Sequence, residues 1–438
     1  MEQRRQYNTP RGHIGRRFSS AGRTFILILS IVLVSGIRCS SLWAEESAIL
    51  DQFYPYRHGA PHIPGLEADV TLSSTNAQLA KEVLPDEILR LLTSGDFTIT
   101  IQETMDLHLR QSYIDATLQH WQSVSLNGGG TLANYQSGAP FPLLDPTDPQ
   151  AGEKLAWNFR YRDFGETFEM WPTTREVNAA GQVEHFDRGI QRIRFGMHRP
   201  NPADNDPRWQ EEGIWQKNFF ELLSPSDREG VMRILTVYED DTRSAEQWRY
   251  TPQNRRTRKD YVNYLAPIGG TYEVLQEEGP PFFFSGYLHA YRWRFLGTQV
   301  MLVPGFTKTT ELQFGGNHGW YPQIPWELRR VLLLECTPKE AHPFGRRVFF
   351  LDQQSYTPLL ILTYTPAGDF LRLILNAHAH PSFHPGSKGV SLPLLIGGAA
   401  INYAVERATL YTSAASATFN PPLAAERFGL MEMLRRGK

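Results

Sequence analysis

Residues 346–377 restrict the fold of this chain more than any other stretch. They predict three strands in succession, at 348–351, 359–364 and 370–375. A polar turn followed by proline separates the first two strands, and a Pro-Ala-Gly-Asp sequence at 366–369 suits a tight turn before the third. Connections this short join antiparallel neighbours, because a parallel pair needs a crossover. The sequence therefore predicts an antiparallel meander.

The rest of the chain predicts more strands and a few helices near its N-terminal end. We found no repeat period and no clean linker. The expected class is α+β, mainly β, with one extended and strongly curved antiparallel sheet and helices over one face. A curved sheet with helices covering its concave side can enclose a space for a hydrophobic ligand. Further strands are expected at 97–101, 232–238, 246–250, 285–296 and 326–336, and helices at 75–93 (divided at Pro85) and 113–121.

The N-terminus has the three parts of a secretory signal. Six arginines precede an apolar run at 25–37, and a small-residue site follows at 40–44. The run is shorter than the roughly 20 apolar residues that span a bilayer. We expect residues 1–44 to be a cleaved signal peptide and 45–438 to form a single domain in the periplasm, with a retained N-terminal anchor as the alternative. Arg38 before Cys39 argues against a lipidation site.

Composition excludes some classes of function and favours none. A formal net charge of −2 gives no support for a nucleic-acid partner. Cleavage after Ala44 would leave Cys336 as the remaining thiol, with no internal disulfide. Cys336 ends an apolar strand, so a buried small hydrophobe is the expected role.

The segment 285–296 offers a candidate ligand-binding surface. In a strand, alternate residues share a face, and one face here is almost wholly aromatic. The same face could equally be ordinary core. The candidate cavity-lining residues are Tyr287, His289, Tyr291, Trp293 and Phe295. In the meander, Val348, Phe350, Leu360 and Leu362 lie on apolar faces, and the sequence leaves open which face would meet a hollow.

A basic cluster follows the predicted strand at 246–250. Its cations are Arg255, Arg256, Arg258 and Lys259. Runs of like charge are usually solvated, so a strand end in water is one interpretation. Contact with a lipid headgroup or a membrane surface is the functional alternative.

Motifs that would indicate catalysis are missing from the sequence. There is no Gly-x-Ser-x-Gly elbow, Ser-x-x-Lys, His-Glu-x-x-His or Cys-x-x-Cys. His378, His380 and His384 are the best metal candidates, but no nearby carboxylate or cysteine completes a ligand set. We therefore predict no enzyme, no metal and no cofactor. A lipid hydrolase remains an alternative that these histidines alone would support.

Several short motifs in a fixed order resemble a known family. They include Leu-Pro-Asp at 84–86, an Asn-Tyr to Phe-Pro run at 134–142, Tyr-Glu-Asp-Asp at 238–241 and Trp-Glu-Leu-Arg at 326–329. Over most of the mature chain, the sequence resembles an uncharacterised family of exported Gram-negative proteins grouped with the outer-membrane lipoprotein-sorting carriers, LolA- and LolB-like. Segments 268–272, 280–284 and 393–396 do not fit the family's pattern.

The resemblance implies a half-open β-barrel with helices at its mouth and a periplasmic carrier of lipid or other hydrophobic cargo. It also implies work alongside an RND-type exporter and an outer-membrane protein. A scaffold subunit that docks an exporter and carries nothing is the alternative. The resemblance supplies no catalytic residue.

Overall fold

The computed structural model describes residues 43–270, 272–387, 389–413 and 417–437. Contacts divide the chain into two units, Met1–Ala48 and Ile49–Lys438, and the second unit is described below. The predicted signal peptide falls mostly on residues 1–42, outside the described residues, and stays a prediction. Within the described ranges, no helix combines the length and apolar character needed to cross a bilayer.

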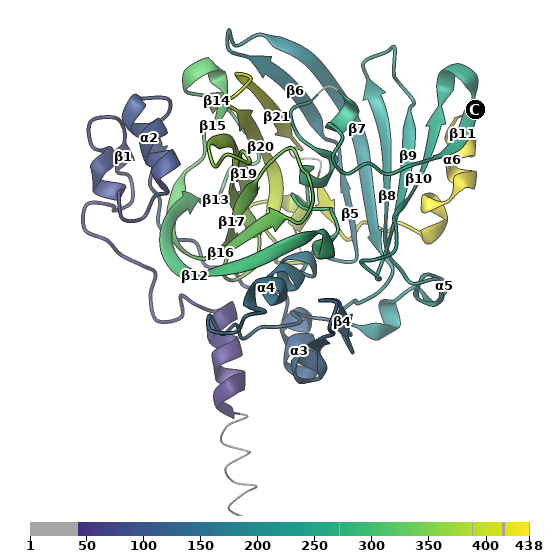
Figure 1. Cartoon of the computed structure of the whole chain (residues 1–438), viewed down its shortest axis with the longest axis horizontal. Coiled ribbons are helices and arrows are strands. Elements are labelled where there is room, and N and C mark those ends of the chain that lie inside the picture. Colours follow the sequence, from purple (N-terminus) through teal and green to yellow (C-terminus); the bar gives the residue numbers. More distant parts are fainter. Residues whose placement is uncertain (1–42, 271, 388, 414–416, 438) are drawn as a thin grey trace, which may run out of the picture. The chain divides into compact units, whose positions relative to one another are not determined.

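One open sheet of 16 strands organises the second unit (Figure 1). Its order is β11-β10-β9-β8-β7-β6-β21-β20-β19-β18-β17-β16-β12, with β5, β13 and β22 paired at the side. All pairs are antiparallel except β13 with β19. The sheet ends at β11 and β12 and is not closed into a barrel. Its 16 strands confirm the prediction of a mainly β chain built on an antiparallel sheet.

The elements have the following bounds. The strands of the sheet are β5 Thr167–Met170, β6 Thr173–Asn178, β7 Val183–Phe195, β8 Ile214–Ser224, β9 Met232–Tyr238, β10 Glu246–Thr251, β11 Arg256–Asp260, β12 Tyr291–Pro304, β13 Phe306–Thr307, β16 Trp326–Pro338, β17 Arg346–Asp352, β18 Pro358–Tyr364, β19 Phe370–Ala379, β20 Leu394–Asn402, β21 Arg407–Thr412 and β22 Thr418–Phe419. Short two-stranded pairs are β1 Thr71–Leu72 with β2 Ile99–Thr100, β3 Ser125–Leu126 with β4 Leu132–Ala133, and β14 Phe314–Gly315 with β15 Tyr321–Pro322. The helices include α2 Asp86–Ser94, α3 Gln111–His120, α4 Ala151–Arg160, α5 Pro207–Glu211 and α6 Leu430–Arg436.

The meander forms as predicted, as β17, β18 and β19, and almost all of its residues are buried on both faces. Directly opposed residues of antiparallel strands share a face. Val348 opposes Leu362 and Phe350 opposes Leu360, so these four lie together. Tyr364, on the same face, is hydrogen-bonded to Glu87 of α2. The four apolar residues therefore share a face with Tyr364, the meander residue that meets α2.

The opposite face, here called the inner face, carries Arg347 and Phe349 of β17. It meets residues 262–285, which connect β11 to β12, through an ion pair between Arg347 and Glu277. This covering segment contains no α-helix in its described residues, only short 3-10 turns. The expectation that helices cover the concave side is therefore not confirmed, although Phe159 of α4 contacts Phe349 at one end.

The C-terminal helix packs on the other side of the sheet. In β9, Met232 and Ile234 are buried in a cluster with Met433 of α6. The alternate residues of β9, among them Arg233 and Leu235, point to the inner face and are half-buried. Strand alternation thus separates a closed outer core from a more open inner surface.

The strand expected at 285–296 begins only at Tyr291, so the prediction is wrong for its first six residues. Leu288–Ala290 form a 3-10 turn. The indole Nε1 of Trp293 donates to the Leu288 carbonyl at 2.9 Å, and the His289 amide donates to Asp241 at 2.9 Å. These two bonds hold the turn, and the alternating pattern continues through it without strand geometry.

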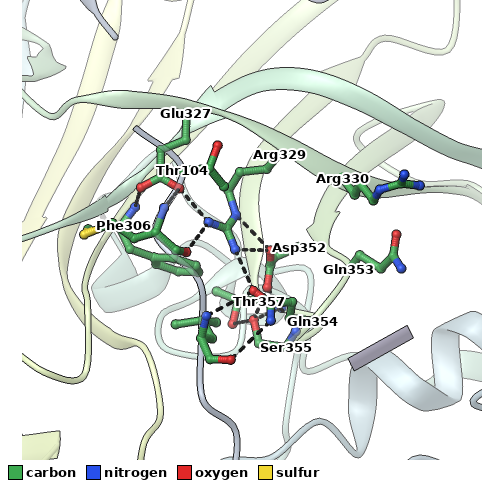
Figure 2. A network of polar contacts seen from close by, with 12 residues as sticks. Thr104, Phe306, Glu327, Arg329, Arg330, Asp352, Gln353, Gln354, Ser355 and Thr357 are labelled. Carbon is green, nitrogen blue, oxygen red and sulfur yellow. Dashed lines mark hydrogen bonds and ion pairs between the residues drawn. The ribbon is translucent and has the colours of Figure 1, made fainter. Parts of the chain in front are cut away.

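A buried ionic network ties residues 102–107 to the meander (Figure 2). Arg329 of β16 lies between Glu327 and Asp352, and all three side chains are fully buried. Its guanidinium also donates to the Met105 carbonyl at 2.8 Å and to Gln354 Oε1 at 3.2 Å. Burial alone lowers the pKa of Arg329, but the two carboxylates outweigh it and hold that pKa above its usual range.

Candidate binding cavity

A cavity of about 400 Å³ lies between the inner face and the covering segment 262–285. Strands β5–β10 form most of its floor, and β19–β21 complete it. Most of the wall is apolar. From the sheet come Met170, Phe220, Leu222, Val231, Leu235, Ile374 and Ala400, and from the covering segment Val262, Ile268, Val274, Phe282 and Phe283.

Buried polar contacts hold the covering segment against the sheet. Glu277 pairs with Arg347 and accepts a hydrogen bond from Tyr291 Oη at 2.7 Å, while Glu278 pairs with Arg372. Burial opposes ionisation of Glu277, but Arg347 and its hydrogen-bond donors leave the pKa below its usual range. The segment is therefore anchored at one end of the cavity by charges that lie out of water.

Polar groups gather in the part of the cavity wall formed by β7, β9 and β10. Arg228 and Asp187 form an ion pair at 2.6 Å. Arg233 and Arg249 lie directly opposite each other on β9 and β10. Burial and the charge of Arg249 lower the pKa of Arg233. The cavity can therefore receive an apolar molecule along most of its length and a polar or charged group at this place.

A family model described as Protein of unknown function (DUF1329) matches residues 71–409. The chain belongs to this family. The expected membership of an uncharacterised family is thereby confirmed. The matched range includes every lining residue of the cavity except Tyr411.

Three solved structures are similar to this chain at low sequence identity. A domain named for outer-membrane lipoprotein sorting from Vibrio parahaemolyticus is 17% identical with a TM-score of 0.46, and covers 66% of this chain and 100% of its own. A DUF1329 protein from Desulfovibrio piger is 13% identical with a TM-score of 0.46 and the same coverage. A LolA superfamily protein from Nitrosomonas europaea is 8% identical with a TM-score of 0.36, covering 62% and 93%. Among curated proteins, the search found no match.

The five residues expected to line a cavity lie outside the wall of this one. Tyr291 and Trp293 are buried beside Phe284 in the main core, and Phe295 is half-buried. Tyr287 Oη accepts from the Ala245 amide at 2.9 Å, and the ring packs edge-on against the cavity residue Tyr264. His289, exposed on the turn, lies 3.0 Å from Asp241. Their role in ligand binding stays a prediction.

The basic cluster lies at the β11 edge of the sheet. Arg255 is in the turn before it, and the rest are on the strand. Arg258 pairs with Asp260 at 2.8 Å and Lys259 with Glu246 at 2.9 Å. Arg256 and Lys259 are exposed, so a contact with a headgroup or membrane surface stays a prediction for this edge.

The three histidines considered for a metal are placed by the end of β19 and the loop that follows. Burial and nearby Arg162 lower the pKa of His378 to about 3. His380 Nε2 lies 2.9 Å from the Asp106 carbonyl oxygen. In the part of the chain that the structure describes, no three His, Cys, Asp or Glu side chains are grouped so as to hold a metal ion.

The sequence offered only partial signals for the residues that do line the cavity. Within the strand predicted at 232–238, Arg233 and Leu235 stand two residues apart, which is the spacing of side chains on a common face. The segments at 268–272 and 280–284, which did not fit the family's pattern, supply Ile268, Phe282 and Phe283 to the wall. Nothing local in the sequence indicated that this segment would cover the sheet.

Proposed function

We propose that this protein binds a hydrophobic small molecule or lipid in the cavity beneath residues 262–285 and carries it through the periplasm. The observation that supports this proposal is the cavity itself, about 400 Å³ and mostly apolar in its lining. Ligand pockets of small molecules usually measure about 300–1,000 Å³. Each methylene buried there would contribute about 0.8 kcal/mol to binding.

Mass spectrometry of the extracted protein tests the proposal directly. The protein is purified from its native host without detergent, and its organic extract is compared with that of an unrelated periplasmic protein. We expect one class of apolar molecule to be enriched in near-stoichiometric amount. If nothing is enriched, and the delipidated protein also fails to bind the neutral fluorescent probe N-phenyl-1-naphthylamine, the carrier proposal is wrong.

A cavity-filling substitution links binding to this site. Leu235→Trp places an indole on the inner face, where Leu235 lines the wall. If the indole excludes a volume of ligand equal to two methylene groups, binding loses about 1.6 kcal/mol, and the affinity for the probe should fall about tenfold or more. Val183→Trp is the matched control, because Val183 lies on β7 of the same sheet, 53% exposed and outside the cavity. Equal affinities for both variants would contradict the assignment of the site.

Partners remain part of the proposal. The resemblance implies an RND-type exporter and an outer-membrane protein, and in-cell crosslinking followed by mass spectrometry would identify them. Recovery of such partners with an empty cavity would instead support the scaffold alternative.

A further inference from the structure

Three arginines occupy directly opposed positions on neighbouring strands at the β11 edge of the sheet. Arg258 of β11 opposes Arg249 of β10, which opposes Arg233 of β9. Opposed residues of antiparallel strands share a face, and like charges in that position destabilise a sheet. Asp260 lies 2.8 Å from both Arg249 and Arg258, so it offsets the outer part of the row.

Arg233 is the inner member of this row and lines the cavity. Among the described residues, no carboxylate lies within ion-pair distance of the Arg233 guanidinium. Arg249 also has donor capacity to spare, since its Nε lies near Asp260 but does not form a hydrogen bond to it. Of the two cations at this place in the wall, Arg249 shares Asp260 with Arg258, and Arg233 has no ion-pair partner in the part of the chain that the structure describes.

Apolar side chains also lie beside Arg233 on the inner face, on the side away from Arg249. Phe220 of β8 lies directly opposite Arg233. Leu235 of β9 and Val231, the residue before β9, also line the wall. A guanidinium placed this way costs free energy of desolvation unless an anion meets it. The same surroundings would hold a hydrocarbon chain against the floor of the cavity.

We propose that the occupant of the cavity is an amphiphile with an anionic head, a carboxylate or a phosphate, bound by Arg233 and Arg249. Its chain extends along the apolar wall formed by residues such as Leu235, Phe282 and Ile374. This inference rests on the proposed function and adds the chemical class of the cargo. Arginine suits the role because its planar donors match the two oxygens of a carboxylate or phosphate.

Ligands with one chain and different heads test the inference on the delipidated mature protein. Hexadecanoic acid, hexadecyl phosphate and neutral hexadecanol displace N-phenyl-1-naphthylamine in a fluorescence titration. We expect at least one of the two anions to bind roughly tenfold or more tightly than hexadecanol, because charge-assisted hydrogen bonds are the strong ones. The tighter anion identifies the head as carboxylate or phosphate. Acetate and inorganic phosphate should not compete at the same concentrations, and competition by either would overturn the assignment to an amphiphile.

Substitutions assign the preference to the two arginines. Arg233→Met and Arg249→Met keep an unbranched apolar stem and remove the charge, so each should reduce the preference for the anion about tenfold and leave hexadecanol affinity within about twofold. Arg188→Met is the matched control, because Arg188 is exposed on β7 of the same sheet and does not line the cavity. Its preference should equal that of the wild type.

Stability separates a binding role from a structural one. If the role of Arg233 is to bind a ligand, Arg233→Met removes only its like-charge contact with Arg249. The urea midpoint of the variant should then equal or exceed that of the wild type. A lower midpoint together with an unchanged head preference would overturn the inference. Equal affinities for the acid, the phosphate and the alcohol would also overturn it while leaving the carrier function standing, whereas failure of every chain to bind would refute the carrier function itself.

Discussion

Arg329→Met is expected to destabilise the fold more than any surface substitution in the same strand. Arg329, Glu327 and Asp352 are fully buried, and Arg329 is the cation between the two carboxylates (Figure 2). Methionine has a similar stem but no charge, so both carboxylates lose their ion-pair partner. Removing one member of a buried ion pair costs about 3–5 kcal/mol. The Met105 carbonyl and Gln354 Oε1 also lose a donor, which favours the upper end of this range.

Calorimetry and urea unfolding followed by tryptophan fluorescence measure this loss. The unfolding entropy is about 2.1 cal/mol/K per residue, or roughly 0.8 kcal/mol/K for a unit of this length. The Tm should therefore fall by about 4–6 °C. Arg330→Met is the matched control, since Arg330 is the next residue of β16 and its side chain is exposed. Its free energy of unfolding should change by about 0.5 kcal/mol or less.

The pH dependence of Arg329→Met provides a second check. Burial already raises the pKa of Glu327, against the opposing effect of Arg329, and loss of the guanidinium should raise it further. When a carboxyl group has a higher pKa in the folded state than in the unfolded state, the free energy of unfolding decreases as pH rises from the unfolded pKa to the folded pKa. The cost of Arg329→Met should thus be smaller at pH 5 than at pH 8. Equal costs at both values, or equal effects of Arg329→Met and Arg330→Met, would refute the reasoning.

Two other buried groups give predictions that need only one variant each. Burial and the neighbouring Glu273 raise the pKa of Glu176 to about 7, so ionisation costs stability as pH rises from about 4.3 towards 8. Glu176→Gln should therefore be more stable than the wild type at pH 8 by roughly 1 kcal/mol or more and similar to it at pH 4, and a stability loss at pH 8 would contradict this. Burial raises the pKa of Cys336 to about 12. In a Cys39→Ser chain, Cys336 should react with Ellman's reagent only after denaturation, and rapid labelling of the native protein would show that the site is open.

The parts of the fold that the sequence predicted depend on local chemistry. The strands predicted at 232–238, 359–364 and 326–336 agree with β9, β18 and β16 to within two residues at each end. Each is a β-rich run bounded by turn residues, so neighbouring residues determine it. The prediction of a strand at 285–296 was wrong for its first six residues for a related reason. Its alternating aromatic pattern is also local, but contacts with the distant Asp241 fold the first half into a turn.

The cavity depends on contacts that no local pattern encodes. Its covering segment is fixed by Glu277 and Glu278, whose partners Arg347 and Arg372 lie 70 and 94 residues further along the chain. In the sequence, Glu277 and Glu278 precede Gly279 and Pro280, a turn-like context in which charges are usually solvated. Once both are buried against two arginines of the meander, the segment between β11 and β12 must cross the inner face. The same crossing covers the part of the sheet that carries Arg233, while Glu277 and Glu278 pair with Arg347 and Arg372 instead.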